Sequence, residues 1–405
     1  MASTINAKSS GAGGIEYTGD ASGTLGLQAN GSTIATVSST GVAVTGALTT
    51  TGAITSNGVV SSPYTMKNRI INGDMRIDQR NAGAAVTANG SFPVDRFKMN
   101  NTSDGTFSAQ QSSTVPSSGG FVNSVLITVT SADTSLTTTQ RLALQQTIEG
   151  YNVADLGWGT ASAKTVTLSF WVRSSLTGTF SGSLRNSAGD RSYPYTYTIS
   201  SANTWEQKTI TIAGDTSGTW LTTNGEGIIL FFSLGVGPSL LGTANTWASA
   251  GYWGATGETP LIGTNGATFY ITGVQLEAGS AATSFEWRPF TTELQLCQRY
   301  FQKSFNYAVV PSNGGASSFS TPYGLIAAYS TNSYASGHTR WVVTMRDVPT
   351  MTYYGNSSGY WAYNGTFHVN VTVGNLASDN GMYFTQQSVG GGAFIYGHYT
   401  ASAEL

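Results

Sequence analysis

The chain has 405 residues, enough for two or three domains, and it is poor in charge. Lys, Arg, Asp and Glu make up 9% of it, against about 25% in typical soluble globular proteins. Its 18 basic and 20 acidic side chains nearly cancel, which excludes the strongly basic surface that nucleic-acid binding requires. With 50 glycines, the composition suits an extracellular fibre better than a cytosolic enzyme.

Cysteine content and hydropathy restrict the compartment. Cys297 is the single cysteine, so an intrachain disulfide is excluded. The first residues lack the pattern of a signal peptide, and no run approaches 18 apolar residues, so we expect neither a signal peptide nor a membrane span. We therefore expect a protein that is made in a cytoplasm but has the composition of an extracellular protein. A virion component released by lysis meets both conditions.

Residues 1–65 are expected to form an extended arm. No charged residue occurs between Asp20 and Lys67, and glycine recurs every six residues from Gly46. In the last third of the arm, large apolar residues recur at even positions, so they share one side of an extended strand. They are Val42, Val44, Leu48, Ile54 and Val60. Three identical chains would bury these side chains on a common axis, which predicts a homotrimeric β shaft. The alternative is a flexible Gly/Ser/Thr linker.

Residues 66–290 change in character and indicate a β domain. Residues 67–80 are charged and aliphatic and predict its first strand. Clearer strands are predicted at 141–148, 165–173, 227–234 and 268–276. Gly273 shifts the alternation in the last of these, which indicates a bulge. Many short strands separated by turns predict an all-β fold with a central β-sandwich of the jelly-roll type.

One helix is expected after the sandwich. Thr292 and Gln295 fit a capping box, which predicts a short linking helix within residues 291–304. Residues 305–405 are rich in aromatic residues and glycine and are expected to form a separate β-rich knob. Strand-like runs in it occur at 340–345, 366–373 and 394–399.

Several blocks resemble tailed-bacteriophage tail fibre and receptor-binding proteins. They are NRIINGDMRIDQR at 68–80, DRF at 95–97, GVQLEAGSAATSFEWRP at 273–289 and LCQRYFQ at 296–302. The resemblance implies a homotrimeric virion fibre whose jelly-roll domain is like those of carbohydrate-binding modules. It also implies that the N-terminal arm docks on a tail, baseplate or head protein, and that the partner outside the virion is a host surface glycan.

Some modules of this kind hold a structural calcium near an Asn-Gly-x-aromatic-Glu motif. Here Met75 and Arg76 replace the aromatic and acidic residues of that motif. Asp74 and Glu277 are the oxygen ligands that remain. No other cofactor is expected.

Carbohydrate recognition needs flat aromatic faces beside amide, carboxylate or guanidinium groups. Trp171 and Arg173 lie on the polar face of their predicted strand, so Trp171 either binds glycan or packs against a neighbouring subunit. Trp158 and the pair Tyr252 and Trp253 lie on predicted loops, where exposed aromatic residues favour binding.

The densest aromatic segment lies in the predicted knob. It contains Tyr353, Tyr354, Tyr360, Trp361 and Tyr363 around a Gly-Asn-Ser-Ser-Gly stretch. Because these residue types serve adaptable binding surfaces well, we expect a glycan-binding loop here. The alternative is a turn whose aromatic rings stack at the trimer axis.

Enzyme signatures are weak. His338, His368 and His398 lack metal-ligand spacing, and Glu149 with Asp155 is a poor candidate for a glycosidase carboxylate pair. We therefore expect adhesion without catalysis, in which a trimer multiplies weak glycan binding. Two alternatives stay open: a purely structural virion fibre, such as a head fibre or baseplate decoration, and a glycan-degrading tailspike.

Overall fold

The computed structural model divides into two units, Met1–Pro63 and Tyr64–Leu405. It describes residues 66–313 without a break, strands of the arm up to residue 44, and segments of the knob region. Those segments are 323–328, 334–354, 361–363, 367–369, 377–387 and 393–405. The described structure is all-β, as expected, with a single α-helix, α1 (Phe290–Gln298). No helix in these described segments has the length and apolar character that a membrane crossing requires.

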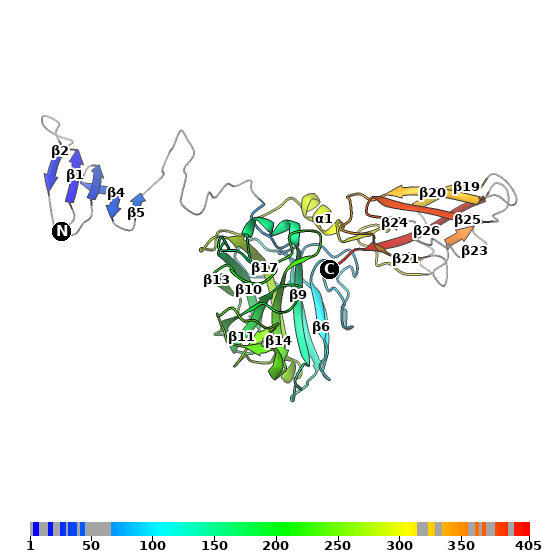
Figure 1. The fold of residues 1–405 in the computed structure, drawn as a ribbon, viewed down its shortest axis with the longest axis horizontal. Coiled ribbons are helices and arrows are strands. Elements are labelled where there is room, and N and C mark those ends of the chain that lie inside the picture. The colour runs from blue at the N-terminus through cyan, green and yellow to red at the C-terminus, as the bar shows by residue number, and fades with distance from the viewer. Residues whose placement is uncertain are drawn as a thin grey trace. The chain divides into compact units, whose positions relative to one another are not determined.

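The arm contains a five-stranded sheet in the order β2-β1-β3-β4-β5 (Figure 1). Its strands are β1 (Ser3–Ala7), β2 (Ile15–Thr18), β3 (Leu25–Ala29), β4 (Ser32–Ser38) and β5 (Gly41–Val44). The described residues up to Val44 therefore form short hydrogen-bonded strands of one sheet. Gly31 explains one reversal, because its φ of 77° suits the tight turn between β3 and β4. Val42 and Val44 are 64% and 40% exposed, whereas Leu48, Ile54 and Val60 lie outside the described residues.

The second unit contains the predicted β-sandwich. We call the sheet β13-β10-β17-β8-β7 sheet I and the sheet β12-β11-β14-β9-β6 sheet II (Figure 1). The strands are β6 (Lys98–Asn101), β7 (Thr106–Ser112), β8 (Ser124–Ser131), β9 (Arg141–Glu149), β10 (Val166–Ser174), β11 (Gly178–Arg185), β12 (Ser192–Ile199), β13 (Glu206–Ile212), β14 (Glu226–Val236) and β17 (Thr268–Ala278). Phe170 and Phe269 of sheet I and Phe180 and Phe232 of sheet II belong to one buried core.

The four clearest predicted strands are confirmed as β9, β10, β14 and β17. The bulge is confirmed as well: the register between β10 and β17 shifts between Ser169 and Trp171, and Gly273 has a φ of 63°. The predicted strand at 67–80 is wrong. Its asparagines bond the backbone locally, since Asn72 Oδ1 accepts from Ile77 N at 2.9 Å and Asn72 Nδ2 donates to Ile77 O.

The linking helix exists but is shorter than expected, because α1 ends at Gln298. It begins directly after Pro289, and no side chain caps it, so the expected capping box is absent. The chain then enters β18 (Phe301–Lys303), in which Phe301 pairs with Ser402. Strand pairing therefore replaces the last predicted helical residues.

The described segments of the knob region form two further sheets. Strands β18, β19, β21 and β22 all pair with β26, and a separate sheet has the order β20-β25-β24. The strands are β19 (Tyr323–Ala328), β20 (Tyr334–Arg340), β21 (Thr350–Tyr354), β22 (Trp361–Tyr363), β23 (Phe367–Val369), β24 (Ala377–Ser378), β25 (Gly381–Gln387) and β26 (Ala393–Ser402). The predicted strand at 340–345 is wrong, because β20 ends at Arg340 and Trp341 turns into the interior, 7% exposed.

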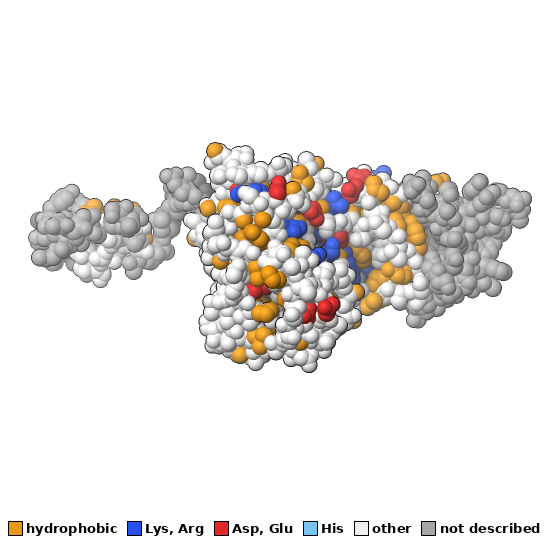
Figure 2. Space-filling view, turned by 60° about the horizontal axis from the view of Figure 1, so that its bottom comes forward, with side chains coloured by type: hydrophobic (Ala, Val, Ile, Leu, Met, Phe, Trp, Pro, Cys, Tyr) orange, Lys and Arg blue, Asp and Glu red, His pale blue; other side chains and the backbone are white. Residues whose placement is uncertain are grey.

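The described surface is mostly uncharged, as the composition requires. Figure 2 shows white polar and backbone atoms over most of the described face, with basic and acidic side chains gathered toward its middle. Solubility of such a surface depends on hydroxyl, amide and backbone groups rather than on charge.

Candidate functional site

The outer face of sheet I carries the side chains predicted for it on β10. Phe170 is fully buried in the core, while Trp171 and Arg173 are half-buried on the opposite face. Trp171 lies in register between Gln207 on β13 and Thr272 on β17. The inference that Trp171 is not a core residue is therefore confirmed.

Arg173 is held beside an aromatic ring. Its Nε donates to the backbone oxygen of Asn203 at 2.8 Å, and its guanidinium carbon lies 4.9 Å from the ring centre of Tyr270. Within the described segments nothing bonds its two terminal nitrogens, so they can donate to a ligand.

Three aromatic residues that sequence reasoning did not select extend this face. Phe121, Phe285 and Trp287 come from two loops, with ring centres 5.0 to 5.2 Å apart. Phe121 and Trp171 meet over Gly273, where an added Cβ would lie 2.6 Å from Phe121 Cζ and 3.2 Å from Trp171 Cδ1. We call Trp171, Phe121, Phe285 and Trp287 the aromatic platform. Trp287 is 47% exposed, so the platform reaches solvent.

The platform combines two kinds of contact. Aromatic ring faces match the C–H-rich faces of pyranose rings. The exposed amide of Gln207 and the free nitrogens of Arg173 match sugar hydroxyls. The only sequence signal for Trp287 is its place in the 273–289 block.

Trp158 was expected on an exposed loop, and this is wrong. Its side chain is 7% exposed and packs edge-to-face on Trp220 and Trp247 at 4.8 and 5.4 Å. Its Nε1 donates to Lys164 O at 2.8 Å. The indole is thus fully used by its own domain.

Trp253 was also expected to be exposed, and it is 7% exposed. Its ring lies 3.9 Å from that of Phe231 on the outer face of sheet II, and the guanidinium carbons of Arg141 and Arg185 lie 4.4 and 5.1 Å from it. Its neighbour Tyr252 is half-buried. The stretch around Trp253 therefore covers sheet II instead of presenting a loop.

The aromatic segment of the knob region is divided between strands. Tyr353 and Tyr354 end β21 and are half-buried, which corrects their assignment to a loop. Burial raises the pKa of Tyr353 to about 12, and Tyr354 packs edge-to-face on Phe305 at 5.3 Å. Tyr360 lies outside the described residues. Trp361 and Tyr363 are the first and last residues of β22.

The two proposed calcium ligands have protein partners. Asp74 is buried and forms an ion pair with Arg76, and burial raises its pKa to about 6. Glu277 accepts hydrogen bonds from Thr283 N at 2.8 Å, Thr283 Oγ1 at 2.6 Å and Gln275 Nε2 at 2.9 Å. Among the described residues, no group of three or more His, Cys, Asp or Glu side chains is placed to hold a metal ion.

Glu149 and Asp155, the candidate glycosidase carboxylates, form separate ion pairs. Glu149 binds Arg299 at 2.5 Å and accepts from the Tyr300 hydroxyl at 2.7 Å. Asp155 binds Arg69 at 2.8 Å. Both carboxylates therefore anchor neighbouring segments.

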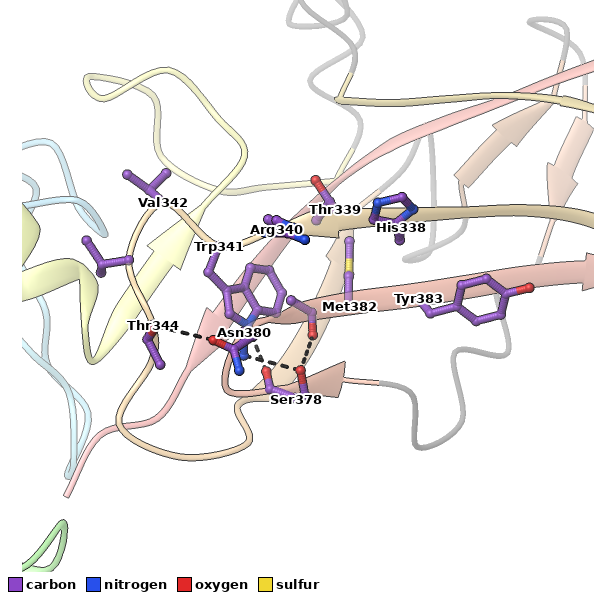
Figure 3. Close-up of a pocket in the computed structure, with 12 residues that line it drawn as sticks. His338, Thr339, Arg340, Trp341, Val342, Thr344, Ser378, Asn380, Met382 and Tyr383 are labelled. Carbon is purple, nitrogen blue, oxygen red and sulfur yellow. Dashed lines mark hydrogen bonds between the residues drawn. The ribbon is translucent and has the colours of Figure 1, made fainter.

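A separate pocket of about 620 Å³ lies where β20 ends and the β24–β25 hairpin turns (Figure 3). Trp341 forms one wall, and its Nε1 donates to Ser378 O at 2.8 Å. His338 and Arg340 of β20 also line the pocket and are exposed. None of these residues was selected from the sequence as a binding candidate.

No family model matches the chain, and no curated protein matches it. Among solved structures it is similar to the enzymatically active domain of Bacteriophage CBA120 tailspike protein 4, with 14% identity and a TM-score of 0.29 over 54% of this chain. The chain spans 22% of the length of that domain. It is also similar to a family 61 carbohydrate-binding module in complex with β-1,4-galactotriose (11%, TM-score 0.26, 52% of this chain and 99% of that one). A third similar structure is the family 11 carbohydrate-binding module of a Clostridium thermocellum cellulase, Lic26A-Cel5E. The identity is 12% and the TM-score 0.25, over 49% of this chain and 98% of that one. Similarity at this level assigns no function.

Proposed function

We propose that this chain is a virion fibre protein that binds a host surface glycan without catalysis. The aromatic platform carries the proposal, because it combines the half-buried Trp171 and the exposed Trp287 on one face beside Arg173. In a protein with so few charges, stacking on aromatic faces with a few hydrogen bonds is the natural way to hold a sugar. The resemblance of residues 68–302 to phage fibre proteins supports the same function.

Assembly would supply the affinity that one platform lacks. We propose a homotrimer in which the exposed Val42 and Val44 join Leu48, Ile54 and Val60 on a common axis. The residues before them would dock on a tail, baseplate or head protein. Three platforms on one particle would convert weak single-site binding into useful avidity.

The test is binding of the purified full-length protein to intact host cells and to a panel of purified bacterial surface polysaccharides. We expect Trp171→Ala and Trp287→Ala each to weaken binding about tenfold or more, since aromatic anchors dominate such sites. Tyr151→Ala is the matched control, because Tyr151 is 61% exposed and lies outside the platform.

Three further readouts separate the alternatives. Light scattering should give three times the chain mass of 42.3 kDa. Saturable binding that both tryptophan variants retain would refute the platform as the site. Absence of any binding by a confirmed trimer would leave a structural fibre, and release of reducing ends from a bound polysaccharide would reveal a tailspike.

A further inference from the structure

We propose that the pocket at the end of β20 binds a carboxylate-bearing residue of an acidic saccharide. This inference rests on the proposed glycan-binding function but uses a site separate from the aromatic platform. At about 620 Å³ the pocket falls within the range of small-molecule sites, about 300–1,000 Å³. It is the charge on its lining that indicates the class of sugar.

The lining is cationic. Among the described residues it includes Arg340 and His338 and no Asp or Glu. Most other arginines in the described segments have a carboxylate partner, as Arg191 has Asp215 at 2.6 Å and Arg299 has Glu149. No described residue forms an ion pair or hydrogen bond with the Arg340 side chain. Its planar fork is thus available for a carboxylate, which it can bind through two parallel hydrogen bonds.

The wall beside Arg340 is rigid. Trp341 is 7% exposed, its Nε1 bonds Ser378 O, and its ring packs against Tyr399 at 5.6 Å. In Figure 3 Arg340 lies between Trp341 and His338. A sugar whose carboxylate meets Arg340 would therefore find a fixed aromatic wall next to it.

The strand register keeps the space beside Arg340 open. Gly381 of β25 is the direct partner of Arg340, so the position paired with Arg340 carries no side chain. A Cβ on Gly381 would collide with Thr339 O and lie 3.2 Å from Arg340 Cα, so this strand pairing requires glycine. The opening is a consequence of how β20 and β25 pair.

Uncharged polar groups complete the lining and match sugar hydroxyls. They come from Thr339, Thr344, Ser378 and Asn380. Thr344 Oγ1 donates to Asn380 Oδ1 at 3.2 Å, which orients that amide. One guanidinium among hydroxyls, an amide and an indole fits an acidic sugar better than a multiply charged phosphate, which would need several cations.

The experiment is calorimetric titration of the full chain with three acidic probes: oligogalacturonate, a glucuronate-containing hyaluronan tetrasaccharide and 3′-sialyllactose. Each is paired with its methyl ester, which keeps the sugar and removes the charge. We expect at least one acid to bind and its ester to bind at least tenfold more weakly. Arg340→Gln should reproduce that loss, and Arg340→Lys should lose less, because a lysine keeps the charge without the fork.

Lys164→Gln is the charge-matched control, since Lys164 is a 55% exposed surface cation that is not part of the pocket lining, and it should leave binding unchanged. Equal binding of acid and ester, full binding by Arg340→Gln, or no binding of any acid would each overturn the inference. If the acidic-sugar inference is overturned but neutral glycans still bind through Trp171, the proposed glycan-binding function stands. If acids bind through Arg340 while the tryptophan variants change nothing, the platform proposal fails alone.

Discussion

Glu404 forms an ion pair with Arg96 across 308 residues of sequence. The Arg96 side chain is 2% exposed, and its guanidinium carbon lies 3.5 Å from the ring centre of Tyr300. The second carboxylate oxygen of Glu404 binds Arg80 at 2.8 Å. One carboxylate thus ties the end of the knob region to two arginines of the sandwich unit, the last residue of the 68–80 block and the central residue of the 95–97 block.

Replacing this carboxylate should be costly. In Glu404→Gln the buried Arg96 keeps its charge without a charged partner, and we expect the free energy of unfolding to fall by about 3–5 kcal/mol. Thermal and urea unfolding would measure it. Asp347→Asn is the control, because that pair with Arg346 has a 53% exposed carboxylate and should change stability by less than about 1 kcal/mol. Equal effects of the two variants would contradict the expectation.

Gly273 and Gly266 offer a matched pair of substitutions. Both have positive φ, 63° and 75°, but a Cβ on Gly266 meets nothing within 4 Å, whereas one on Gly273 meets Phe121 and Trp171. We expect Gly266→Ala to lower stability by about 1–2 kcal/mol through backbone strain alone. Gly273→Ala should lower it further and weaken glycan binding. Similar losses in both variants would show that the platform does not depend on the bulge.

Asp74 should make stability depend on pH. Burial raises its pKa from 3.8 to about 6, so between these values the folded protein binds a proton that the unfolded chain does not. Stability from this group therefore rises as the pH falls from 7 to 4. The difference in unfolding free energy between Asp74→Asn and the natural protein should therefore shift in favour of the variant as the pH rises from 4 to 7, by up to about 3 kcal/mol. A pH-independent difference in unfolding free energy would contradict this cause.

Cys297 should be inert in the folded protein. It is fully buried, and burial raises the pKa of its thiol well above the ordinary value. Because the thiolate is the reactive form, iodoacetamide at pH 8 should label the urea-unfolded chain and leave the native chain unlabelled. Mass spectrometry would count the added groups. Rapid labelling without denaturant would show that α1 opens readily.

The sequence predicted those parts of the fold that depend on local alternation. The pattern from Val166 to Arg173 specified which side of β10 enters the core, and Gly273 marked the bulge. The exposure of Trp158 and Trp253 could not be predicted in this way. Both rings are buried by residues distant in sequence, Trp220 for Trp158 and Phe231 for Trp253. The glycine-rich local sequence indicates an exposed loop, and only the tertiary packing shows that these indoles are buried.

The candidate sites follow the same division. Trp171 was found because its strand pattern excluded it from the core. Phe121 and Trp287 were missed because only folding brings their loops to Gly273. The Arg340 pocket depends on the register of β20 against β25, and no pattern within either strand specifies that register.

The pair between Glu404 and Arg96 also has a consequence for synthesis. The ribosome makes Arg96 308 residues before its partner, an interval of roughly 15 to 60 s at ordinary elongation rates. During that time Arg96 lacks its carboxylate partner, so this corner of the sandwich is held less firmly than in the finished protein. A nascent chain interrupted before Glu404 would open more readily at this corner and present it to chaperones and proteases. Full stability of the corner therefore depends on translation of residue 404.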